Sequence, residues 1–155
     1  MPGSTARPLP PFAAAPASGA SVVVLFETAV DGAEPSTAQP AGALFAAAGE
    51  VLAPAAGATA AIAAPLQAPA TGAVIFDRTG AFVGLVAAVP QMPRRVAGIV
   101  PVSAYPIVPS TAVAGFLGGA GKPLQSATTN APVAVTAAAI AAEASQSIVP
   151  VTCGL

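Results

Sequence analysis

The sequence predicts a mainly β domain, a single six-stranded antiparallel β-barrel with a short helix after it and an Ala-rich helix near the end of the chain. Three observations support this fold class. Short runs of Val, Ile, Leu and Phe recur between turn residues, as in closed or sandwiched antiparallel sheets. One segment has the pattern of a tight hairpin. The length of 155 residues suits one domain with a modest core.

Residues 1–20 are predicted to form an arm or linker, because five prolines there remove backbone donors and restrict φ. The strands of the first half are expected where apolar runs lie between turn residues. The second and third of them meet at Gly49. The expected ranges are 21–26, 42–47, 50–53 and 59–64. An Ala-rich helix over 41–64 stays open as a minor alternative, because alanine favours helices.

The clearest supersecondary pattern is a hairpin over 72–89, where AVIFD and AFVGLVAAV flank a short turn. Gly80 in that turn can adopt the positive φ that a tight hairpin requires. Asp77, which precedes the turn, is expected to accept hydrogen bonds from backbone amides. A further strand is expected at 96–102, where Val and Ile recur.

Two helices and a terminal strand complete the predicted elements. Ser110 is expected to cap a helix over 110–117, which Gly118 and Gly119 close. After a polar linker, the Ala-rich stretch 133–145 predicts a second helix. The segment SIVPVTC at 147–153 predicts a last strand, and its proline indicates an edge position. The chain is thus divided into an arm (1–20), a barrel (21–121) and a carboxy-terminal linker, helix and edge strand (122–155).

The composition excludes several classes of function. Only 7% of the residues are charged, against about 25% in an average globular domain, and the net charge is −1. Five scattered basic residues cannot follow a phosphate backbone, so nucleic-acid binding is not expected. The mean hydropathy is +0.78, but the apolar runs reach about half of the roughly 20 residues that a membrane-spanning helix needs. A surface so poor in charge indicates that a partner protein covers part of it.

Few residues of this sequence are suited to catalysis or metal binding. Histidine, the commonest general base and a leading metal ligand, is absent. Glu27, Asp31 and Glu34 lack the spacing of a calcium loop and are interpreted as a solvated loop. Cys153 is the single cysteine, and three states stay open for it: a buried strand residue, a free thiol, or a bridge to another chain. No cofactor or metal is expected. The amino terminus also lacks the long apolar stretch of a secretory signal.

The segment 69–84, PATGAVIFDRTGAFVG, resembles the nucleophile hairpin of trypsin-like serine proteases, in which a GxSGxPvfd segment leads through a turn into an lvGiv strand. The segment 108–117, VPSTAVAGFL, is similar to the part of the HtrA-like bacterial branch where a final strand leads into a closing helix. The resemblance covers about residues 20–118. It implies the second barrel of the trypsin-like type alone.

The same resemblance implies a catalytically degenerate barrel. The nucleophile position falls on Thr71, which we interpret as a turn residue beside Gly72. Pro69 stands where the family has a glycine whose N–H helps to form the oxyanion hole, and proline has no N–H. The family's His and Asp lie in a first barrel, which this chain is too short to contain. The resemblance therefore implies a protein that is not an enzyme.

Three hypotheses of function follow. The favoured one is a non-catalytic interaction protein, an accessory subunit or scaffold in a larger assembly. The alternative is a module that binds a peptide or cell-wall fragment in a remnant cleft beside Thr71 and 96–102. The third is an enzyme completed by the His and Asp of another subunit. The resemblance favours the bacterial periplasm or cell envelope and leaves room for peripheral association with a membrane complex. The candidate interaction residues are Arg94, Arg95, Val149, Val151 and Cys153, the last three in the terminal strand. The alternative interpretation of Arg94 and Arg95 is a solvated loop.

Overall fold

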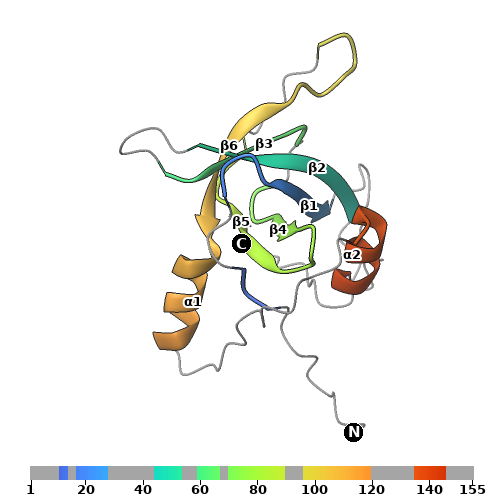
Figure 1. The fold of residues 1–155 in the computed structure, drawn as a ribbon. Coiled ribbons are helices and arrows are strands. Elements are labelled where there is room, and N and C mark those ends of the chain that lie inside the picture. The colour runs from blue at the N-terminus through green and yellow to red at the C-terminus, as the bar shows by residue number, and fades with distance from the viewer. Residues whose placement is uncertain are drawn as a thin grey trace, which may run out of the picture.

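The computed structural model describes residues 11–13, 17–27, 44–53, 59–66, 70–89, 96–119 and 135–145. Within these residues, six antiparallel strands close into a barrel, and two short helices lie on different sides of it (Figure 1). The elements are β1 (Ser21–Glu27), β2 (Leu44–Leu52), β3 (Ala61–Ala64), β4 (Val74–Asp77), β5 (Phe82–Val86), β6 (Ser103–Pro109), α1 (Ser110–Gly119) and α2 (Ala137–Ala144). The predicted mainly β barrel with two helices is therefore confirmed.

The strands follow one another around the barrel in the order β1-β2-β3-β6-β5-β4, and β4 pairs with β1 to close it. β1 pairs on one side with β2, from Ser21↔Glu50 to Glu27↔Leu44, and on the other with β4, from Val22↔Asp77 to Leu25↔Val74. The predicted 72–89 hairpin is also confirmed, since β4 and β5 pair across a tight turn in which Gly80 has a φ of 80°. Closure leaves no free edge along β1.

The residues of β1 explain why the barrel is covered on its outside. Val22, Val23, Val24 and Leu25 are each at most 1% exposed. Successive side chains of a strand point to opposite faces, so Val22 and Val24 join the cluster inside the barrel, whereas Val23 and Leu25 join a second cluster outside it. Ile140 of α2 packs into that outer cluster. A run of β-branched residues that is buried on both faces thus requires the helix that covers it.

The strand expected to break at Gly49 is continuous in the structure. β2 runs through Gly49, which pairs with Val22 of β1. A Cβ atom built on Gly49 would lie 2.9 Å from the Ala63 carbonyl oxygen and 3.2 Å from the Ala64 Cβ. The glycine therefore permits close approach of β3 and does not mark a turn. The helical alternative for 41–64 is wrong, because the described part of that range contains β2 and β3.

The strand predicted at 96–102 is also wrong. Val96 and Ile99 exchange two backbone hydrogen bonds of 2.9 and 3.0 Å across a two-residue turn, in which Ala97 and Gly98 have φ values of 50° and 80°. Positive φ at both central residues is typical of a type I′ turn. The strand, β6, begins only at Ser103 and includes two prolines. The 96–102 segment stands out from the barrel at the top of Figure 1.

Both predicted helices exist, with different ends. Ser110 begins α1, but its hydroxyl donates to the Ala13 carbonyl oxygen at 3.1 Å and does not cap the helix. The second helix begins at Ala137, later than expected, because the Thr136 hydroxyl accepts a hydrogen bond from the Ala139 amide and caps it. The strand predicted at 147–153 lies outside the described residues. No helix among the described residues is long and apolar enough to cross a membrane.

Candidate functional site

Thr71, which only the sequence resemblance assigns to a nucleophile position, lies in a tight turn between Ala70 and Ala73. The Ala73 amide donates to the Ala70 carbonyl at 3.0 Å, and Gly72 has a φ of 83°. Thr71 is exposed, and its hydroxyl accepts the Val89 amide at 3.1 Å. The hydroxyl thereby ties the residues before β4 to the residues after β5. This is the turn role expected from the sequence, and the contact gives the hydroxyl no base that could remove its proton.

The hairpin turn between β4 and β5 is organised by Asp77. Its Oδ1 atom accepts the Thr79 amide at 2.8 Å, the Thr79 hydroxyl at 2.6 Å and the Ala81 amide at 3.0 Å. The expectation that Asp77 accepts hydrogen bonds from backbone amides is confirmed. All three donors lie within four residues of the carboxylate, so Asp77 stabilises the turn.

Several candidates from the sequence lie outside the described residues. These are Pro69, Arg94, Arg95, Val149, Val151 and Cys153, together with Asp31 and Glu34. Among the residues that the structure does describe, no three His, Cys, Asp or Glu side chains come close enough to hold a metal ion.

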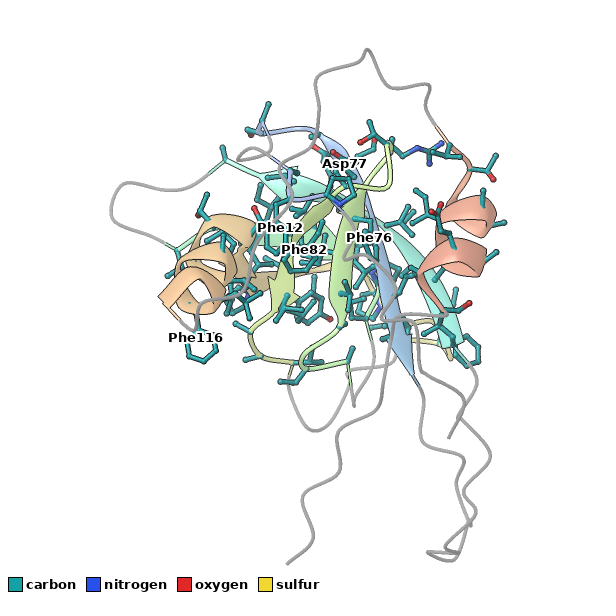
Figure 2. The ribbon with its side chains drawn as sticks, turned by 90° about the horizontal axis from the view of Figure 1, so that it is seen from below. Phe12, Phe76, Asp77, Phe82 and Phe116 are labelled. Atoms are coloured by element: carbon teal, nitrogen blue, oxygen red, sulfur yellow. The ribbon has the colours of Figure 1, made fainter. Side chains whose placement is uncertain are left out.

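The most distinctive feature of the described surface is a set of exposed apolar side chains. Phe116 of α1 is 79% exposed and points away from the barrel (Figure 2). In the segment before β6, Ile99 is 71% and Val102 is 67% exposed. No charged residue occurs between Val96 and Gly119. The sequence predicted 96–102 only as a strand beside a cleft and did not predict the exposure of Phe116, although one signal was available: a helix that is apolar all round normally requires a covering surface.

The exposed side chains extend along one continuous stretch of chain. The 96–102 segment leads directly into β6, and β6 leads without a break into α1. Val108, on the outer face of β6, is 39% exposed. We call Val96, Ile99, Val102, Val108 and Phe116 together the apolar surface. They follow one another along the chain and do not form one compact patch, since the 96–102 segment and α1 lie at opposite ends of β6 (Figure 1). Comparison of the chain with protein-family models, with curated proteins and with solved structures gives no match.

Proposed function

We propose that this chain is a non-catalytic interaction protein, in which a barrel of the trypsin-like type acts as a scaffold or accessory subunit for other protein chains. The apolar surface is the observation that carries the proposal. Of the residues of α1, only Ser110 is buried, while Phe116 is 79% exposed. Exposed apolar area of this kind is a liability for an isolated soluble domain and is relieved when a partner covers it.

The order of the elements supports the trypsin-like part of the proposal. The resemblance implied a hairpin preceded by the nucleophile position, then a final strand leading into a helix. The turn at Thr71 precedes the β4–β5 hairpin, and β6 runs directly into α1. An antiparallel barrel closed by six strands is consistent with the same expectation.

The non-catalytic part of the proposal is supported by Thr71 and by composition. The Thr71 hydroxyl is engaged as an acceptor by the Val89 amide, and the chain has no histidine to activate it. Labelling of Thr71 by a serine-directed fluorophosphonate, in the chain or in its native complex, would contradict this part. The alternative function, a peptide bound beside Thr71, was expected to use a strand over 96–102 as the other wall of the cleft. That segment is not a strand.

Native mass spectrometry of the chain, isolated gently from its own source, tests the proposal. We expect a complex of fixed stoichiometry. Phe116→Asp should weaken the complex by about 30- to 1000-fold in Kd, since an aromatic side chain that is buried at an interface contributes roughly 2–4 kcal/mol. The matched control is Ala138→Asp, an exposed position of α2 on another side of the barrel (Figure 1).

The control variant should retain the partner. A monomeric wild-type chain would contradict the scaffold function. Equal loss of the partner in both variants would also contradict it, because the effect would then not depend on the apolar surface. Circular dichroism of both variants should match that of the wild-type chain.

A further inference from the structure

We propose that the corner between β5 and α1 is a binding site for an extended, uncharged peptide with an aromatic residue at its centre, and that the chain fills this site with its own residues 11–13. The proposal goes beyond the interaction through Phe116 and does not depend on it. The ligand class is a segment of the pattern Pro-Phe-small. In trans, the occupant is a partner chain's segment of this pattern.

The backbone of Phe82 holds the arm as a strand would. Phe82 donates its amide to the Pro11 carbonyl at 2.8 Å, and its carbonyl accepts the Ala13 amide at 2.9 Å. Phe12 and Phe82 form a parallel bridge. The pairing of β5 with β6 starts only at Gly84↔Pro109, because the chain turns into α1 there. The edge of β5 at Phe82 is therefore left for another extended segment, as in recognition by strand addition.

The side chain of Phe12 adds an aromatic contact. Its ring packs edge-to-face on Phe82, with the ring centroids 5.1 Å apart, and Phe82 packs in the same manner on Phe76 at 6.5 Å. The three rings lie together between the two helices in Figure 2. Phe76 and Phe82 are 4% and 7% exposed and belong to the outer cluster. The barrel thus offers an aromatic surface on which the ring of Phe12 packs.

Ser110 contributes a polar contact to the backbone of the bound segment. It is 1% exposed, and its hydroxyl donates to the Ala13 carbonyl at 3.1 Å. Burial of a hydroxyl is unfavourable unless it forms a hydrogen bond. Ser110, the first residue of α1, therefore binds the backbone carbonyl of the residue that follows the aromatic one. Pro11 contributes only its carbonyl to Phe82, so a residue without an N–H fits that position.

The site is distinct from the turn at Thr71. That turn contacts the other end of β5, where the Gly72 amide donates to the Val86 carbonyl at 2.8 Å. Residues 11–13 precede β1 by a short stretch of sequence, so their effective concentration at the site should be on the order of millimolar. A free peptide must compete with this tethered segment for the site. The test therefore begins with a variant, Phe12→Ala, in which the tethered segment binds more weakly.

The experiment uses the full chain with Phe12→Ala and a fluorescein-labelled peptide of residues 8–15, PLPPFAAA, which has no charged side chain. Fluorescence anisotropy should show saturable binding, at least about tenfold tighter than to the wild-type chain, whose own arm competes. The same peptide carrying Phe12→Ala should bind at least about tenfold more weakly, because it lacks the ring. Adding Ser110→Ala to the protein should weaken binding by about three- to tenfold. Thr111→Ala is the matched control, because Thr111 is the exposed neighbour of Ser110.

The proposal is overturned if a folded Phe12→Ala chain shows no saturable binding, or if Ser110→Ala and Thr111→Ala act alike. Should Phe12→Ala fail to fold, Phe12→Leu keeps an apolar side chain but removes the ring, and the same two outcomes decide. A dimer that forms by exchange of residues 11–13 and is lost in Phe12→Ala would support the site, with a second copy supplying the segment.

Discussion

Two glycines determine how closely the strands of the barrel approach one another. Gly49 lies against Ala63 and Ala64 of β3, and a Cβ atom on Gly84 would collide with the Val108 carbonyl of β6 and lie 3.2 Å from the Pro109 Cα. Both contacts involve the backbone of a neighbouring strand. Backbone atoms cannot move aside as the end of a flexible side chain can, so these positions have no room for a larger residue.

Replacement of Gly84 and of Gly115 by alanine should therefore change the free energy of unfolding in opposite directions. Gly84→Ala should lower the free energy of unfolding by roughly 1–3 kcal/mol, because β5 and β6 must separate. Gly115→Ala should raise it by roughly 0.5–1 kcal/mol, since a Cβ there meets nothing within 4 Å and alanine favours the helix. Urea unfolding of both variants measures the difference. Similar changes in the two variants would show that the close approach at Gly84 is not limiting.

At the scale of the elements, α2 depends on the barrel for its stability. It has eight residues, fewer than an isolated helix needs in water. Its one buried residue is Ile140, 4% exposed, which packs over Val23 and Leu25 of β1. The remaining residues of α2 are alanines and Glu143. Docking of α2 through Ile140 therefore decides whether this helix is formed.

Ile140→Ala should release α2 from the barrel. The loss of roughly 2–4 kcal/mol of packing should speed hydrogen exchange of the α2 amides by about 30- to 1000-fold. The Ser145 amide, which donates to the Ala141 carbonyl at 2.9 Å, is a suitable probe. Glu143→Ala is the control and should change stability by less than about 0.5 kcal/mol. Unchanged exchange in Ile140→Ala would mean that other contacts hold the helix.

At the scale of the whole molecule, the surface combines few charges with exposed apolar side chains. The chain has five basic and six acidic residues in 155. The stretch from Val96 to Gly119, which carries the apolar surface, has none of them. An interface built on it gains its free energy from apolar burial, with little contribution from charge.

The Kd of the proposed association should therefore depend little on salt concentration, and its binding enthalpy should depend on temperature. Between about 50 mM and about 500 mM NaCl, Kd should change by less than about threefold, and the heat-capacity change of binding should be negative. Isothermal titration at several temperatures and salt concentrations measures both quantities. A steep loss of affinity with salt would contradict binding through the apolar surface and would indicate charged contacts, with Arg94 and Arg95 as the first residues to test.

Local patterns predicted the elements whose burial and turns are encoded in neighbouring residues. β1 is a run of β-branched residues, and the β4–β5 hairpin contains both Asp77 and Gly80. Thr71 was correctly interpreted as a turn residue from the glycine beside it. The exposure of Phe116 was not predicted, because sequence alone does not tell which face of an apolar helix the barrel covers.

What the sequence determined by itself is a mainly β chain with little charge, a hairpin and two short helices. The tertiary structure decided the roles of Gly49, Ser110 and Phe12. Gly49 lies within a strand, Ser110 binds the carbonyl of Ala13, and Phe12 packs on Phe82. The physical reason is the range of the contacts. Turn preferences and alternation act between near neighbours in sequence, whereas these three roles depend on segments that closure of the barrel brings together.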